Sequence, residues 1–177
     1  MSTDIVSFIE TVWHKEDNFH FILSDEQKTC LELMVREPYF IGELGRQKGK
    51  TEMCLMYALY ISMRYTPANV YIIGKKDLFQ LMRKRLEKLM MVKWTDNGNN
   101  TFHMYTGSNI CFSSEDIENA SHVIIDEEID MNILERVDKN ANITILSSEI
   151  DEEIKKDKKY CYLRFPEEEE QYTILYE

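Results

Sequence analysis

The strongest constraint on the fold is a glycine-containing loop between an apolar run and an apolar helix. The run is Tyr39 to Leu44, and Gly45-Arg46-Gln47-Lys48-Gly49-Lys50-Thr51 follows it. In a strand–loop–helix unit, glycines let backbone N–H groups turn toward a phosphate, and the helix N-terminus adds positive potential. Lys50 would then reach the β- and γ-phosphates of a nucleotide, and the Thr51 hydroxyl would ligate Mg²⁺.

The loop departs from the phosphate-loop (Walker A) pattern G-x-x-x-x-G-K-[ST] at its first position. Leu44 stands where the first glycine is expected, and Gly45 comes one residue late. Taken alone, the segment also fits an ordinary strand-to-helix turn with an incidental lysine. The nucleotide-binding residues predicted here are Gly45, Arg46, Gln47, Lys48, Gly49, Lys50, Thr51 and Glu52.

A second motif is an apolar strand, His122 to Asp126, that ends in the carboxylate pair Asp126-Glu127. In a P-loop NTPase the aspartate of such a Walker B pair orients Mg²⁺, and the following glutamate polarises the attacking water. Carboxylates at the C-terminal end of a parallel strand face the crevice where ligands bind. An acidic pair after a strand is often only a helix cap. Together with the loop, however, the pair predicts nucleotide binding, with Thr51 and Asp126 at the metal and Lys50 and Glu127 in catalysis.

The remaining pattern predicts an α/β fold with a largely parallel sheet and antiparallel pieces at one edge. The chain of 177 residues suits one domain, in which residues 1–18 form an amphipathic helix, 19–150 the nucleotide-binding core and 151–177 acidic C-terminal strands. The predicted helices cover 25–37, where Ser24 and Gln27 form a capping box, 52–65, a basic segment to about 93, and 131–138. The predicted strands cover 39–44, 69–74, 121–126, 142–146, 159–165 and 171–176, with a hairpin of 102–105 and 110–113.

The net charge of −11 is unevenly distributed and argues against a wholly nucleic-acid-binding surface. Residues 1–114 carry 14 basic and 13 acidic side chains, whereas residues 115–177 carry 7 and 19. A basic segment can contact a phosphate backbone, or it can be the solvated face of an amphipathic helix. The residues predicted as DNA contacts are Lys75, Lys76, Arg83, Lys84, Arg85 and Lys88.

Targeting signals and metal-binding cysteine pairs are not apparent. No stretch approaches the ~20 apolar residues of a membrane span, and the N-terminus lacks the basic region of a secretory signal. The four cysteines form no C-x-x-C pair, which predicts reduced thiols in a cytosolic protein and no zinc site.

The order of these motifs resembles the ATPase domain of the large terminase subunit of tailed phages, the DNA-packaging motor. The resemblance covers about residues 19–150. It rests on the R-Q-x-G-K-T form of the loop, on a preceding segment ending in Gln27, on a hairpin near 105–110, and on the strand ending in Ser147-Ser148. It implies a P-loop NTPase fold of the RecA/ASCE type, with ATP and Mg²⁺ as ligands.

The resemblance also implies roles for individual residues. Gln27 would contact adenine, Arg46 would act in cis on the γ-phosphate, and Ser147 and Ser148 would couple hydrolysis to movement along DNA. Each has a simpler interpretation: Gln27 completes a capping box, Arg46 pairs with a surface acid, and Ser147 ends a strand.

The leading hypothesis is therefore a Mg²⁺-dependent ATPase of a viral DNA-packaging ring, acting on double-stranded DNA in the cytoplasm of the infected host. The family implies a homo-oligomeric ring and a portal or small terminase subunit as partners, with Arg136 or the basic segment as a charge supplied to a neighbour. The family's nuclease domain is not present in these 177 residues, so the chain is an excised motor domain, a split-gene subunit or a standalone relative. The alternatives are a helicase-like ATPase and a nucleotide-binding structural or regulatory protein with little or no hydrolysis.

Overall fold

The computed structural model describes residues 4–13, 22–74, 77–89, 92–96, 98–114, 117, 119–127, 131–165 and 173–175. Its centre is a nine-stranded sheet in the order β3-β4-β5-β2-β6-β7-β1-β8-β9. The strands are β1 (Tyr39–Leu44), β2 (Asn69–Ile73), β3 (Trp94–Asp96), β4 (Thr101–Met104), β5 (Asn109–Cys111), β6 (His122–Asp126), β7 (Asn142–Ser147), β8 (Cys161–Phe165) and β9 (Thr173–Leu175).

The sheet is mainly parallel, which confirms the predicted fold class. Strands β5, β2, β6, β7, β1 and β8 pair in parallel, in that order. Antiparallel pairing occurs at both edges, in β3-β4-β5 and in β8-β9, whereas the sequence predicted it at one edge. Strand β7 lies between β1 and β6, so the two strands that carry the nucleotide motifs are separated by one strand.

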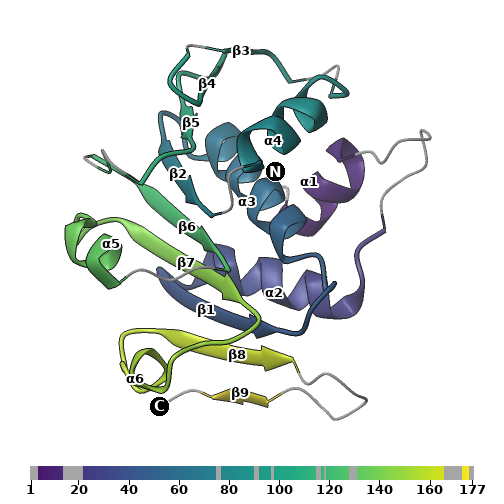
Figure 1. Ribbon diagram of the computed structural model, residues 1–177. Helices are drawn as coiled ribbons and strands as arrows, with labels where there is room; N and C mark the ends of the chain where they lie inside the picture. Colours follow the sequence, from purple (N-terminus) through teal and green to yellow (C-terminus); the bar gives the residue numbers. More distant parts are fainter. Residues whose placement is uncertain are drawn as a thin grey trace.

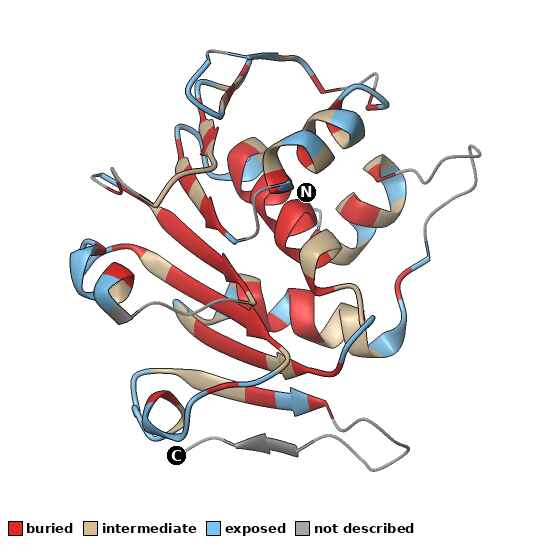
Figure 2. Cartoon of the chain, in the orientation of Figure 1, coloured by how far each residue is buried: buried red, intermediate tan, exposed pale blue. Residues whose placement is uncertain are grey.

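Helices cover both faces of the sheet and enclose two apolar cores (Figures 1 and 2). Helices α1 (Ile5–Val12), α2 (Asp25–Arg36), α3 (Lys50–Arg64) and α4 (Leu78–Leu86) lie on one face, and α5 (Met131–Arg136) and α6 (Glu152–Lys155) on the other. Most of α3 is buried, as expected for a helix that is apolar nearly all round. The central helix is thereby packed against the sheet directly behind the glycine-containing loop.

The described elements differ from the predicted ones mainly at their ends. Helix α4 stops at Leu86 rather than near Lys93, and the chain turns into the short strand β3, which the pattern did not predict. Three residues are too few for a period-2 pattern, and β3 forms through pairing with β4. The N-terminal helix is described over Ile5–Val12 only, where Asp4 caps it; residues 14–21 lie outside the described part of the chain. No described helix has the length and apolar character that crossing a membrane requires.

Candidate nucleotide-binding and catalytic site

The phosphate loop lies between β1 and α3, at the C-terminal edge of the sheet. Gly49, at the N-cap of α3, has φ +80°, and Gln47 has φ +63°. Both values are in the left-handed region, which favours glycine, so the loop makes a tight turn into the helix. Leu44 is the last residue of β1 and is buried in the core, which explains why an apolar side chain occupies the position of the missing glycine.

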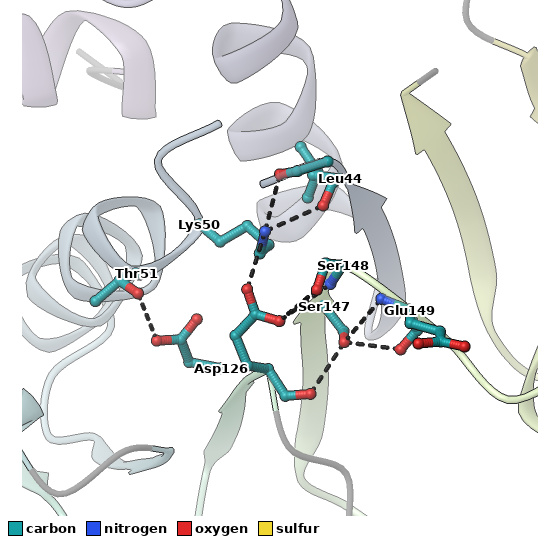
Figure 3. Close-up of polar contacts among 9 residues, drawn as sticks. Leu44, Lys50, Thr51, Asp126, Ser147, Ser148 and Glu149 are labelled. Carbon is teal, nitrogen blue, oxygen red and sulfur yellow. Dashed lines mark hydrogen bonds and ion pairs between the residues drawn. The ribbon is translucent and has the colours of Figure 1, made fainter. Parts of the chain in front are cut away.

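Lys50 is buried and bonded entirely within the site. Its Nζ donates to the carbonyl oxygens of Leu44 at 3.1 Å and Gly45 at 2.9 Å, and it forms an ion pair with Glu127 Oε1 at 2.9 Å. Its side chain is only 5 % exposed. A buried ammonium group is stable only when it is paired and hydrogen-bonded in this way. Figure 3 shows Lys50 pointing from the start of α3 toward the carbonyl end of β1.

Thr51 and Asp126 meet across the site. The Thr51 hydroxyl donates to Asp126 Oδ2 at 2.7 Å (Figure 3), and Asp126, at the end of β6, is 2 % exposed. Within the described residues no group of three or more His, Cys, Asp or Glu side chains could hold a metal. Mg²⁺ at a nucleotide site typically takes one or two protein oxygens, and the phosphates and water supply the rest. A hydroxyl and a carboxylate in contact fit this requirement.

Glu127 is held by α3 and by the end of β7. Its Oε2 accepts hydrogen bonds from the Ser148 hydroxyl at 2.8 Å and the Ser148 N–H at 3.2 Å, while Oε1 faces Lys50. Burial alone raises the pKa of Glu127, but the hydrogen bonds from Lys50 and Ser148 outweigh it and lower the pKa below its ordinary value. The side chain is therefore a carboxylate at neutral pH, the form that a general base requires.

Ser147 holds the main chain of the same residue. Its hydroxyl oxygen lies 2.9 Å from the carbonyl oxygen of Glu127 and 2.8 Å from that of Glu149, so its single proton can be donated to either. Glu127 has φ +74°, an uncommon conformation for a residue with a side chain. Both serines that were predicted to couple hydrolysis to movement thus contact Glu127, although the coupling role itself remains a prediction.

Gln27 both caps α2 and contacts the phosphate loop. The capping box with Ser24 is present, and Gln27 Nε2 also donates to the carbonyl oxygen of Lys48 at 3.2 Å. An ion pair between Lys48 and Glu26, at 3.1 Å, makes a second link between this helix start and the loop. The adenine contact remains a prediction, and Phe21, in the same segment, lies outside the described residues.

Arg46 and Glu52, the other predicted nucleotide contacts, lie in different environments. Arg46 is exposed, and it forms no ion pair within the described part of the chain. The Glu52 carboxylate instead binds Arg85, at 2.5 Å to Nη2 and 3.2 Å to Nε, and it accepts a hydrogen bond from Trp13 Nε1 at 3.1 Å. This three-residue contact was not predicted, because nothing in the sequence pairs residues 39 and 33 positions apart.

The predicted DNA-contacting segment is divided by the fold. Arg85 is turned inward to Glu52 and its side chain is 16 % exposed, so its position does not support a DNA contact. Arg83 lies 3.5 Å from both Glu87 and Asp96, while Lys84 and Lys88 are exposed. Lys75 and Lys76 lie outside the described residues.

A cleft of about 570 Å³ opens beside the two motif carboxylates. Thr51, Asp126 and Glu127 line one side, and α4 and the residue before it line the other. The residues contributed from that side are Asp77, Leu78, Gln80, Leu81 and Lys84. The cleft is large enough to admit a phosphate group and its metal ion next to the glycine-containing loop.

No protein-family model matches the sequence, and a search of curated proteins found no match. Solved structures do match. The large terminase of a thermophilic bacteriophage aligns with a TM-score of 0.62 and 14 % identity, over 81 % of this chain and 44 % of that chain. The fold is that of a large terminase ATPase domain.

Two further solved structures have a similar fold. The large terminase ATPase domain of Thermus phage P74-26 matches with a TM-score of 0.51 and 15 % identity, over 72 % of this chain and 70 % of that chain. The UvsW helicase of bacteriophage T4 matches with a TM-score of 0.60 and 13 % identity, over 85 % of this chain and 61 % of that chain. The chain spans less than half the length of the thermophilic phage's terminase, whose structures include complexes with ADP and ATP-γ-S. The chain therefore has the α/β fold, with a mainly parallel sheet flanked by helices, that these terminases and this helicase share.

Proposed function

We propose that this chain is a Mg²⁺-dependent ATPase, the motor domain of a terminase-like viral DNA-packaging machine. The observation that carries the proposal is the way two adjacent carboxylates are held: Lys50 of α3 and Ser148 after β7 bind the carboxylate of Glu127. Thr51 of α3 binds Asp126 at the end of β6. A nucleotide-binding turn alone would not require a carboxylate held in this position.

The chain's own residues divide the work of hydrolysis. Thr51 and Asp126 would hold Mg²⁺, which would supply charge neutralisation on the phosphates when bound. The backbone N–H groups of the loop and Lys50 bind the phosphates, so Lys50 exchanges Glu127 for a phosphate oxygen. Glu127 stays oriented by Ser148 and accepts a proton from the attacking water. The water oxygen bonds to the γ-phosphorus as the bond to the β-phosphate oxygen breaks, leaving ADP and phosphate.

The partners follow from the same proposal. Double-stranded DNA is the track, contacted by Lys75, Lys76, Arg83 and Lys88. The chain assembles into a homo-oligomeric ring, binds a portal or small terminase subunit, and acts in the cytoplasm of the infected host. Gln27 contacts adenine and Arg46 acts on the γ-phosphate; each can be tested by mutagenesis without removing a core side chain.

The test is steady-state ATP hydrolysis with Mg²⁺, with and without double-stranded DNA, for wild type and Glu127→Gln. Loss of a general base lowers the rate by about 10²–10⁴. Glu149→Gln is the matched control, because Glu149 lies two residues from the motif serine Ser147 and is exposed. Turnover that DNA stimulates, that Glu127→Gln abolishes and that Glu149→Gln leaves intact supports the motor. Tight ATP binding without turnover at high protein concentration would instead identify a nucleotide-binding module.

DNA stimulation also separates the motor from a helicase-like ATPase. The UvsW likeness makes this second candidate specific, because the same fold serves a helicase. Stimulation by single-stranded DNA alone would favour the helicase-like ATPase. Stimulation by blunt double-stranded DNA would favour packaging.

A further inference from the structure

We propose that Lys84 is an additional cation of the nucleotide site, acting within the same chain on the terminal phosphate, and that Arg85 and Glu52 position it there. This inference rests on the proposed function, because it needs a nucleotide in the cleft. It replaces DNA contact as the role of Lys84 and adds a role for the inward-turned Arg85.

The cleft brings Lys84 to the metal side of the site. Lys84 lines the same 570 Å³ cleft as Thr51, Asp126 and Glu127. Those three residues hold the metal and the attacking water in the proposed mechanism, so this end of the cleft receives the terminal phosphate rather than the base. An exposed lysine on a flexible four-carbon stem reaches across such a space as a point charge.

The arrangement of α4 directs Lys84 into the cleft. Leu78, Met82 and Leu86 are the buried positions of this helix and pack into the core. Gln80 and Lys84, four residues apart, lie one above the other on a different face, and both line the cleft. Leu78 and the partly buried Leu81 line the cleft as well, so α4 borders the candidate nucleotide site along the side that carries Gln80 and Lys84.

An ion pair holds this helix against the phosphate-loop helix. Glu52 follows Thr51, and Arg85 follows Lys84, so the Glu52–Arg85 contact joins the two segments immediately beside the residues that line the cleft. The two hydrogen bonds from one guanidinium fix an orientation as well as a distance. Trp13, 1 % exposed, donates to the second oxygen of Glu52 and closes the contact from the end of α1.

The charged side chains around the cleft leave Lys84 available to a bound nucleotide. Asp77, Asp126 and Glu127 contribute carboxylates, while Lys50 is already bonded to Glu127 and to the carbonyls of the loop. Lys84 forms no ion pair within the described part of the chain. A nucleoside triphosphate with one Mg²⁺ keeps excess negative charge, and its terminal phosphate carries the part that ADP lacks.

The test compares binding of ATP-γ-S and ADP, each with Mg²⁺ and without DNA, to wild type, Lys84→Ala, Lys84→Arg and Lys88→Ala. Lys88 is the matched control, because it is an exposed lysine one turn further on, outside the cleft. We expect Lys84→Ala to weaken ATP-γ-S binding about tenfold, as for loss of a charge-assisted hydrogen bond, and to change ADP binding less than about twofold. Lys84→Arg should restore most of the ATP-γ-S affinity.

The positioning role of Arg85 has its own readout. Arg85→Ala should reproduce the selective loss of ATP-γ-S affinity, and Arg85→Ala/Lys84→Ala should be no worse than Lys84→Ala. A purely structural role for Arg85 would instead weaken both nucleotides and add to the Lys84 defect.

Other outcomes overturn the inference. Equal loss of ATP-γ-S and ADP affinity in Lys84→Ala and Lys88→Ala would show that both act only through general surface charge. Unchanged nucleotide affinity with weakened DNA binding would make Lys84 a DNA contact. Failure of the wild type to bind ATP-γ-S would refute the proposed function itself, whereas binding without turnover leaves the Lys84 comparison fully interpretable.

Discussion

Ser148→Ala isolates the hydrogen bond that holds the Glu127 carboxylate. The substitution removes the hydroxyl donor at 2.8 Å and keeps the Ser148 N–H donor at 3.2 Å. A hydrogen bond to a charged group contributes about 1.5–3 kcal/mol. Because the Glu127 side chain is 25 % exposed and keeps Lys50 as a partner, we expect a loss at or below the lower end of this range, about 1–1.5 kcal/mol in the free energy of unfolding.

The sign of the pH dependence follows from the pKa of Glu127. Since its pKa is lowered in the folded protein, the carboxylate's stabilisation is complete above the unfolded-state pKa of about 4.3. It is lost as the pH falls through the folded-state pKa. The Ser148→Ala defect should therefore be full at pH 7 and shrink as the pH falls through the lowered folded-state pKa of Glu127, because a protonated carboxyl group is the weaker acceptor.

The assay is urea unfolding of four proteins at pH 7: wild type, Ser148→Ala, Glu127→Gln and the double variant. With a slope of about 2–3 kcal/mol/M, Ser148→Ala should lower the urea midpoint by about 0.5 M. In the Glu127→Gln background the same substitution should cost clearly less, because the acceptor is neutral. Equal midpoint shifts in the two backgrounds would refute the assignment. Ser148→Thr, which keeps the hydroxyl, serves as the control.

Three further outcomes test the site and the core. Burial lowers the pKa of His122 to about 4, whereas the unfolded chain binds the same proton near pH 6.5. As the pH falls from about 6.5 to 4, the unfolded state is therefore protonated first, and up to about 3 kcal/mol of the free energy of unfolding is lost. An NMR titration midpoint of His122 above about pH 6 would contradict this. A Cβ at Gly42 would lie 2.8 Å from Leu146 Cδ2, so Gly42→Ala should destabilise β1 by about 1–3 kcal/mol, and an unchanged Tm would show that Leu146 moves aside freely. Thr51→Ala should weaken Mg²⁺-dependent ATP-γ-S binding, whereas Thr51→Ser, which keeps the hydroxyl, should preserve it. A chelator should abolish the difference in affinity between the two variants. If the difference persists without Mg²⁺, Thr51 is not a metal ligand.

The local conformation of the two motifs was largely predictable, because the residues of each motif are consecutive in the chain. Gly49-Lys50-Thr51 must start a helix, and Asp126-Glu127 must end a strand, wherever the rest of the protein lies. The capping box at Ser24 was equally readable, since all its atoms come from four successive residues. Local pattern was less informative for the end of α4 and for β3, because the three residues of β3 form a strand only through pairing with the next strand, β4.

The way these segments meet could not be read from the sequence. Nothing in the order of the motifs indicates that Ser148 bonds Glu127, that Glu52 turns from the nucleotide to Arg85, or that Lys84 lines the cleft. The first two contacts join residues 21 and 33 positions apart, and all three depend on which strands are neighbours and how α4 packs.

The sequence by itself determined the α/β class and the local conformation of the two motifs, because spacing, glycine placement and apolar periodicity act within a few residues. Tertiary structure alone decided which carboxylate faces the lysine, which arginine is turned inward and which lysine lines the cleft. The physical reason is that β7 lies between β1 and β6, which brings Ser148 to Glu127, and that the fold brings Arg85 of α4 to Glu52 of α3, although the chain keeps these residues far apart.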